Sequence, residues 1–152
     1  MTNSNSFKFY NEYHLNPINK MFHLIGIPLI ILSVINFSNY FSLVFNYNNI
    51  NHSLSLKRLL ITYYQIYYLS YGIFPGFVMI VYFELLNIIN NSLNLSFRNT
   101  AIIFTLSWIL QFIGHYIEGR KPAILDSISQ SLLGAPIFSL VPLIPSLKKY
   151  LL

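Results

Sequence analysis

Long apolar runs separated by short polar segments predict a series of helices along the chain. The first run predicts a helix over residues 17–41, because Asn16 suits the N-cap and Pro17 suits the first turn. A later run predicts a helix over residues 100–118. The last apolar stretch, residues 123–147, contains three prolines. We therefore expect a helix in its first half and a re-entrant or interfacial segment in its second half.

The longest apolar run, residues 59–89, exceeds the roughly 20 residues that one membrane crossing needs. Two glycines and a proline within residues 72–76 interrupt it near the middle. We therefore predict two short helices, over residues 57–71 and 75–90, joined by a tight turn. Glu84 falls inside the second of these helices, where we expect a neutral or paired carboxyl group.

Residues 46–56 are polar and rich in asparagine, which predicts a loop. We expect His52, which lies in this segment, to be solvated at the membrane face where the first helix ends. If both short helices cross the membrane, the end of the helix at 100–118 returns to the face where the first helix begins. Polar side chains at those two helix ends can then satisfy one another, which favours two crossings.

Composition indicates the class of protein. Of the 152 residues, 55% are hydrophobic and 9% are charged, against roughly 25% charged in a typical soluble domain. These values predict an all-α, polytopic membrane bundle of about five hydrophobic helices, in a single integral membrane domain over residues 1–152. The net charge of +5 is scattered, so we expect membrane lipid and no nucleic acid as a partner. The absence of cysteine excludes thiolate metal ligands, and the oligomeric state is left open.

Polar side chains gather where one predicted helix ends. Gln111, His115 and Glu118 stand at positions i, i+4 and i+7, which places them on one helix face. Gly119 and Pro122 then end the helix. Burying such a face in lipid or protein costs several kcal/mol unless the polar groups find partners. A metal ion is a suitable partner for them.

The next predicted helix begins near residue 122 and places Asp126 and Gln130 on one face. Arg120 and Lys121 lie between the two helices, where they either extend to lipid headgroups or bind a substrate carboxylate. Glutamines in this setting usually form hydrogen bonds between helices. We nevertheless retain Gln111 and Gln130, with the two basic residues, as candidate substrate contacts.

Three histidines are expected to meet at the membrane face where the chain enters. His23 lies in the second turn of the first helix, and the Asn-Pro pair after His14 keeps that residue outside the helix, so it can fold back. Together with His115 and the nearby carboxylates of Glu118 and Asp126, they suit Fe(II), Mn(II) or Zn(II). The alternative is a set of interfacial histidines that pair with one another or with headgroups.

Two motifs carry a resemblance to a known family. Residues 14–29 contain a histidine, Asn-Pro, a second histidine and Gly-x-Pro. Residues 108–136 contain Gln-Phe-x-Gly-His, a glutamate, Lys-Pro-Ala and a Gln-Ser-Leu segment that ends in Ala-Pro. Together they resemble the family of small endoplasmic-reticulum membrane proteins that includes a fungal 2-hydroxy fatty acid dioxygenase. The resemblance covers both ends of the chain, whereas the middle matches in hydropathy only.

This resemblance implies an Fe(II)-dependent enzyme that uses dioxygen to shorten a 2-hydroxy fatty acid by one carbon. It implies a location in the endoplasmic reticulum, or in the host or cell membrane if the source has no nucleus. It also implies that His14, His23 and His115 hold the iron, with Glu118 and Asp126 as a fourth ligand or as orienting groups. The residues alone also allow a non-catalytic lipid-binding or scaffold protein, or a zinc-dependent lipid hydrolase.

Overall fold

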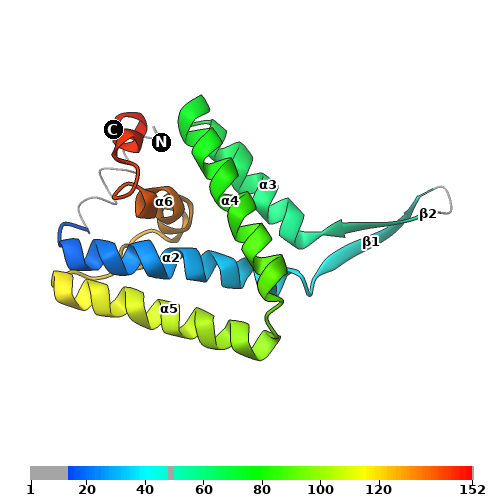
Figure 1. Cartoon of the computed structure of the whole chain (residues 1–152), viewed down its shortest axis with the longest axis horizontal. Coiled ribbons are helices and arrows are strands. Elements are labelled where there is room, and N and C mark those ends of the chain that lie inside the picture. The colour runs from blue at the N-terminus through cyan, green and yellow to red at the C-terminus, as the bar shows by residue number, and fades with distance from the viewer. Residues whose placement is uncertain (1–13, 48–49, 152) are drawn as a thin grey trace. The chain divides into compact units, whose positions relative to one another are not determined.

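A computed structural model describes residues 14–47 and 50–151, which form mainly helices (Figure 1). The helices are α2 (Pro17–Ser38), α3 (Leu56–Leu69), α4 (Ile73–Leu93), α5 (Phe97–Glu118), α6 (Ile128–Leu140) and α7 (Lys148–Leu151). Two 3-10 turns, at Ala123–Leu125 and Pro145–Leu147, precede α6 and α7. The predicted all-α class is confirmed, and α2 to α6 correspond to the five hydrophobic helices that the sequence predicts.

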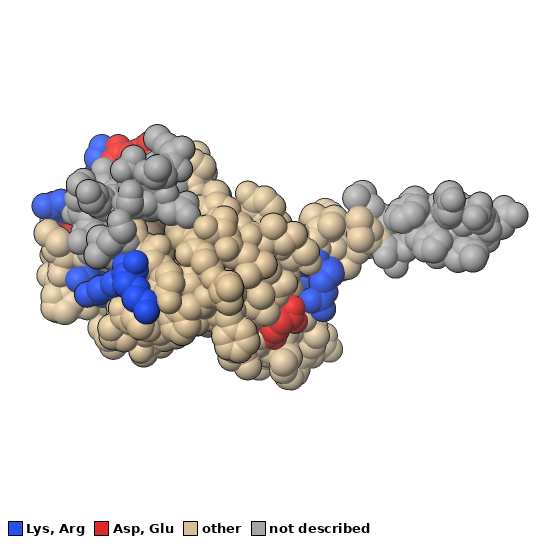
Figure 2. Space-filling model, turned by 90° about the horizontal axis from the view of Figure 1, so that it is seen from above, with Lys and Arg blue, Asp and Glu red and all other residues tan. Residues whose placement is uncertain are grey.

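Three of these helices, α2, α4 and α5, are long and apolar enough to cross a membrane. Together with the low content of charged residues, they identify the chain as a membrane protein. Figure 2 shows charged side chains as small, separate groups on a surface that is mostly uncharged. The 14 residues of α3 and the 13 of α6 are fewer than the roughly 20 that a perpendicular crossing needs.

Several helix boundaries differ from the prediction, most of them by two or three residues, and at two of them local turns intervene. α2 ends at Ser38 rather than at residue 41, and the Ser38 hydroxyl donates back to the carbonyl oxygens of Val34 and Ile35. The helix expected to begin near residue 122 begins at Ile128, after a 3-10 turn. Asp126 therefore precedes α6, and the prediction that it shares a helix face with Gln130 is wrong.

The segment that the sequence predicts as a loop contains a β-hairpin. Strands β1 (Ser42–Tyr47) and β2 (Ile50–Ser55) are antiparallel, with the first residue of each opposite the last residue of the other. The loop prediction over residues 46–56 is therefore wrong. The two strands are connected in the sequence by Asn48-Asn49, and a two-residue connection with asparagine is a known hairpin signal.

The chain divides into two compact units. One contains Met1–Ile30 with Thr105–Leu152, and the other contains Ile31–Phe104. α2 and α5 each run from one unit into the other. The first unit therefore contains both motifs, at residues 14–29 and 108–136, and the second unit contains the α3–α4 pair.

In the second unit, α3 and α4 form a tight antiparallel pair. Its buried side chains include Ile61, Tyr68, Met79 and Phe83. Gly72 in the connecting turn has a φ of 121°, a conformation that favours glycine. A Cβ atom at Gly76 would lie 2.5 Å from Cδ2 of Leu69, so glycine allows the close approach of the two helices. The predicted break into two helices joined by a tight turn is confirmed, but the second helix, with 21 residues, is longer than predicted.

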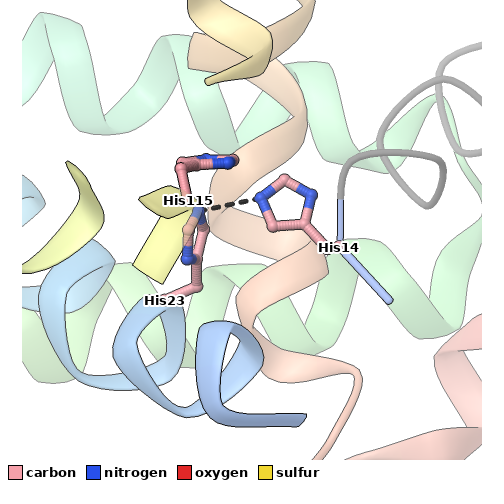
Figure 3. A group of neighbouring side chains, drawn as sticks. All are labelled: His14, His23 and His115. Carbon is pink, nitrogen blue, oxygen red and sulfur yellow. Dashed lines mark hydrogen bonds between the residues drawn. The ribbon is translucent and has the colours of Figure 1, made fainter. Parts of the chain in front are cut away.

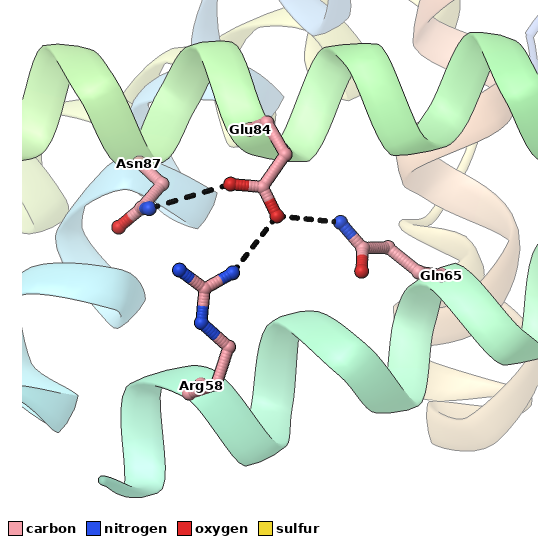
Figure 4. A network of polar contacts seen from close by, with 4 residues as sticks. All are labelled: Arg58, Gln65, Glu84 and Asn87. Atoms are coloured by element: carbon pink, nitrogen blue, oxygen red, sulfur yellow. Dashed lines mark hydrogen bonds and ion pairs between the residues drawn. The ribbon is translucent and has the colours of Figure 1, made fainter.

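Glu84 has partners on both helices of this pair (Figure 4). Its Oε1 accepts hydrogen bonds from Nη1 of Arg58 and Nε2 of Gln65, both at 2.9 Å. Its Oε2 accepts a longer one, of 3.5 Å, from Nδ2 of Asn87. The prediction of a paired carboxyl at this position is confirmed.

Amide side chains connect three helices within the second unit. Nδ2 of Asn36 in α2 donates to the carbonyl oxygen of Leu95 at 3.0 Å and to the hydroxyl of Thr100 in α5. Nδ2 of Asn90 in α4 donates to Oδ1 of Asn36 at 3.2 Å. These bonds hold the last turns of α2 and α4 beside the start of α5.

In the first unit, α2 and α5 pack against each other through glycine. A Cβ atom on Gly26 would overlap Nε2 of Gln111, and one on Gly114 would overlap Oδ1 of Asn19. Small residues are typical of places where membrane helices approach closely. Because residue 19 meets residue 114 and residue 26 meets residue 111, the helices are antiparallel. The start of α2 therefore meets the end of α5.

We expect Gly26→Ala to destabilise the protein by about 1–3 kcal/mol, because the new methyl group displaces the buried amide of Gln111 from its hydrogen bonds. Thermal unfolding in detergent micelles measures the change. Ile25→Ala is the matched control, since Ile25 is a half-exposed neighbour on α2 and should change stability by less than about 0.5 kcal/mol. Equal melting temperatures for Gly26→Ala and the unaltered protein would contradict this packing.

A candidate metal centre of three histidines

Three buried histidines meet in the first unit (Figure 3). His14 precedes α2, His23 lies in its second turn, and His115 lies in the last turn of α5; their exposed fractions are 3%, 6% and 5%. The ring centroids are 4.3 Å apart for His14 and His23, and 5.0 Å apart for each of the other two pairs. The structure thus brings together the three histidines that the sequence singles out. Their role as metal ligands stays a prediction.

A backbone carbonyl fixes the orientation of the His23 ring. Nδ1 of His23 lies 3.0 Å from the carbonyl oxygen of Asn19, one turn earlier in α2. Because a carbonyl oxygen only accepts, Nδ1 carries the proton, and in the neutral ring Nε2 presents a lone pair. This Nε2 is 2.8 Å from Nε2 of His14. Histidines that bind metals usually donate their second ring N–H to a carbonyl or carboxylate in this way.

The cluster fits a transition-metal ion on two observations. Two imidazole nitrogens bound to one ion at about 2.1 Å, near a right angle, would be about 3 Å apart. The 2.8 Å between the Nε2 atoms of His14 and His23 is close to that value. In addition, Nδ1 of His115 is buried and has no hydrogen-bond partner, which is costly unless something binds there. Three imidazoles without a thiolate suit Fe(II), Mn(II) or Zn(II).

Glu118, the last residue of α5, binds the start of α2 through its carboxylate. Oε1 accepts from the backbone N–H of Leu15 at 2.9 Å, and Oε2 accepts from that of Asn16 at 2.8 Å. Oε2 also accepts from Nδ2 of Asn19 at 3.1 Å. Glu118 therefore contacts the residue after His14 and the residue whose carbonyl holds His23. These contacts give it a positioning role, and it is not part of the group of potential metal ligands.

The ends of α2 and α5 at the site follow rules that the sequence shows. Oδ1 of Asn16 accepts from the N–H of Ile18, so the predicted N-cap is confirmed. Gly119 has a φ of 72°, its N–H donates to Tyr116, and the next N–H donates to the His115 carbonyl. This pair of bonds is a Schellman motif, which ends α5 where the sequence predicts. Both ends are thereby held next to the histidines.

Gln111 forms the hydrogen bond between helices that its position suggests. Its Nε2 donates to the carbonyl oxygen of Phe22 in α2 at 3.1 Å. Its Oε1 is buried and has no hydrogen-bond partner. Gln111 is thus one helical turn from His115 on the same face, with one acceptor atom available.

Lys121 and Asp126 pair with each other at a place apart from the group of three histidines. Nζ of Lys121 forms an ion pair of 2.6 Å with Oδ1 of Asp126, and both lie in the connection between α5 and α6. Within the described part of the chain, the one group of at least three potential metal ligands contains only His14, His23 and His115. Arg120 is exposed just beyond α5. The side chains of Gln130 in α6 and His52 in β2 lie outside the described part.

Asn19 is the site residue that reasoning from the sequence misses. Its backbone carbonyl holds His23 and its side chain donates to Glu118, so it connects two members of the site. The available signal is its position four residues before His23, on the same face of a mostly apolar helix. Its full burial, with an exposed fraction of 0%, agrees with this role.

Fold and site together define a membrane protein of helices with a buried cluster of three histidines. The chain matches the family described as 2-hydroxy-palmitic acid dioxygenase Mpo1-like over residues 1–147, and it belongs to this family. It is similar to the 2-hydroxy-palmitic acid dioxygenase MPO1 of Saccharomyces cerevisiae, with 36% identity over 133 residues, which cover 86% of this chain and 72% of the yeast protein. No solved structure matches the chain. The family membership inferred from the two motifs is confirmed.

If the three histidines bind metal, replacing any of them with alanine removes one ligand and should lower the content of bound iron from near one per chain to near zero. Elemental analysis after anaerobic reconstitution of the purified protein with Fe(II) measures this content. His52→Ala is the matched control, since it removes the fourth histidine of the chain and should leave the iron content unchanged. Loss of iron in His52→Ala together with full iron content in His14→Ala would disprove the assignment.

Proposed function

We propose that this chain is an Fe(II)-dependent dioxygenase that shortens 2-hydroxy fatty acids by one carbon. The buried cluster of His14, His23 and His115 is the observation that carries the proposal, because it gives the chain a site where dioxygen chemistry can occur. Membership in a family with a relative named 2-hydroxy-palmitic acid dioxygenase supports the substrate class. The apolar helices support a substrate with a long alkyl chain.

The three histidines would hold the iron, with the ring of His23 oriented by the Asn19 carbonyl. Ferrous iron bound there would supply redox chemistry with dioxygen, and it would have positions open for the oxygen atoms of a 2-hydroxy acid. The burial of all three rings keeps bulk water from the reacting groups.

The proposed reaction balances without a further reductant. A 2-hydroxy acid and one dioxygen molecule give the acid with one carbon fewer, carbon dioxide and water. The bond between the carboxyl carbon and the hydroxyl-bearing carbon breaks. The four electrons released from these two carbons reduce dioxygen fully. The protein therefore has to bind and orient two reactants and needs no electron donor.

We assign to Gln111 a contact with the 2-hydroxyl group of the substrate. Its amide nitrogen is held by the carbonyl oxygen of Phe22, so its orientation is fixed and Oε1 is left as a buried acceptor. The 2-hydroxyl group of the substrate would donate a hydrogen bond to Oε1 of Gln111. A fatty acid without this hydroxyl would leave Oε1 unpaired. Arg120 and Lys121 lie just beyond His115 at the end of α5, where the carboxylate of a fatty acid would enter. Gln130 and Asp126 stay candidates from the sequence.

Glu118 would act by positioning the histidines. Glu118→Gln introduces an N–H donor opposite the N–H groups of Leu15 and Asn16, which should displace His14 and weaken iron binding by about 10–100-fold. Titration of Fe(II) against the metal-free protein measures this affinity. Glu84→Gln is the matched control, because it alters an equally hydrogen-bonded carboxylate in the other unit and should leave the iron affinity unchanged. Equal affinities for the two variants would remove Glu118 from the site.

Aerobic incubation of the iron-loaded protein with 2-hydroxypalmitic acid should yield the C15 acid, detected by mass spectrometry. Palmitic acid, which lacks the 2-hydroxyl, is the matched control and should give no shortened product. His23→Ala should lower the rate by orders of magnitude, since it removes a ligand. Product formation that persists without dioxygen would instead favour a zinc-dependent lipid hydrolase. A lack of bound metal under all conditions would favour a lipid-binding or scaffold protein.

We also propose the endoplasmic reticulum as the location of the protein in a nucleated cell. The three apolar helices support a membrane location, and the choice of this particular membrane rests on the motif resemblance alone. The tagged full-length chain should co-fractionate with an endoplasmic-reticulum marker. Co-fractionation with mitochondrial or plasma-membrane markers would contradict the proposal.

A further inference from the structure

The contacts between the ends of α2 and α5 restrict how the chain crosses the membrane. Glu118 at the end of α5 accepts hydrogen bonds from the backbone just before α2, so these two helix ends lie at one membrane face. If α2 and α5 each cross, their other ends lie at the opposite face. The intervening residues 39–96 therefore start and end at that opposite face. They must make an even number of crossings.

If α2, α4 and α5 were the only helices to cross, residues 39–96 would make one crossing, through α4, which is an odd number. If α4 crossed once and α3 did not, Asn16 and Glu118 would be separated by a bilayer of about 30 Å, whereas they are hydrogen-bonded. A crossing by α3 as well would restore an even number. However, its 14 residues extend only about 21 Å, and its first turn carries Lys57 and Arg58.

The α3–α4 pair divides into an apolar tip and a polar base. The first eleven residues of α4, residues 73–83, contain no charged or amide side chain, whereas Glu84, Asn87, Asn90 and Asn91 follow within its last ten. Arg58 pairs with Glu84, and Nζ of Lys57 donates to Asn91 at 3.0 Å. All charged groups of the pair therefore lie at the end away from the turn.

Exposure follows the same division. Around the tip, large apolar side chains point outward, with exposed fractions of 65% for Ile66, 87% for Ile73 and 64% for Phe77. At the base, the side chains of the Arg58–Glu84 ion pair are 55% and 37% exposed, which suits water or headgroups and is costly in hydrocarbon. The β-hairpin ends directly before α3, and its unpaired strand edges also exclude the base from the hydrocarbon layer.

We infer that α3 and α4 form a re-entrant hairpin that inserts into one lipid leaflet and returns to the face from which it enters. The eleven residues between the start of α4 and Glu84 span about 16 Å, which is about half of a hydrocarbon layer of 30 Å. The tip at Ile73 then lies among acyl chains near the middle of the bilayer, and the Arg58–Glu84 pair lies at the headgroups. The partner of this surface is lipid. The inference goes beyond the proposed function, because it uses no property of the reaction.

Single cysteines introduced into the full-length chain test the hairpin, since the chain has no native cysteine. Ile73→Cys and Phe77→Cys report on the tip, and both replace outward-facing residues, so the core stays intact. Ser55→Cys reports on the base, and Asn99→Cys, at the exposed start of α5, is the control. Each variant is reconstituted into sealed vesicles of phosphatidylcholine with a uniform orientation. Labelling with a membrane-impermeant maleimide from each side is combined with depth measurement by nitroxide spin labels.

We expect the base and the control to react from the same side. We expect the two tip positions to react from neither side, with the label at Ile73 about 15 Å below the headgroups. Reaction of Ile73→Cys from the side opposite Asn99→Cys would show two full crossings and overturn the inference. Its reaction from the same side would show a hairpin lying at the surface, which also overturns it. Reaction of Ser55→Cys and Asn99→Cys from opposite sides would do the same.

Discussion

The carboxylate of Glu118 at the start of α2 is the interaction on which the rest of the structure depends. It accepts backbone N–H groups that a helix start leaves without partners, and it does so from the last residue of another helix. The pairing aligns α2 and α5 as antiparallel neighbours, so that residues 23 and 115 come level. The same contact places His14 beside the other two histidines, because Glu118 binds the N–H group of Leu15, the next residue. One side chain thereby fixes the positions of three rings that lie in three segments of the sequence.

Burying polar groups in a chain this apolar is costly unless they pair, and many of the buried polar groups described do so. Asn36, Asn90 and Thr100 satisfy one another between helices, and Glu84 collects donors from α3 and α4. The exceptions in the first unit include Oγ of Ser131 in α6 and two atoms that lie one helical turn apart on α5, Nδ1 of His115 and Oε1 of Gln111. Since an unpaired buried polar atom is expensive, its retention at the histidine cluster is better explained by a bound ligand than by stability.

The sequence predicts those features that depend on local spacing, and it misses those that depend on contacts between side chain and backbone. The N-cap at Asn16, the helix end at Gly119 and the tight turn at Gly72 follow from residue types at fixed positions, and each is present. The expectation that the histidines meet rests on helix periodicity and on the need of buried polar groups for partners, which favours two crossings between the two helices. Half of the role of Asn19 could not be predicted, because it holds His23 through a backbone carbonyl that every residue possesses. Asp126 was misplaced for a related reason, since a 3-10 turn after Pro122 delays α6 by several residues.

The two motifs that indicate the family lie on either side of residues 39–96, although the match to the family extends over residues 1–147. The geometry gives a physical reason for the position of the two motifs. Every described residue of the histidine cluster and of its supports comes from residues 14–30 or 105–118. Residues 39–96 connect α2 to α5, and in the inferred arrangement they return the chain to the membrane face at which α2 ends. A hairpin with an apolar tip and a charged base meets that requirement with many sequences, because lipid accepts any apolar side chain. A histidine cluster accepts almost no substitution, because each ligand atom has to lie within a few tenths of an ångström of its place.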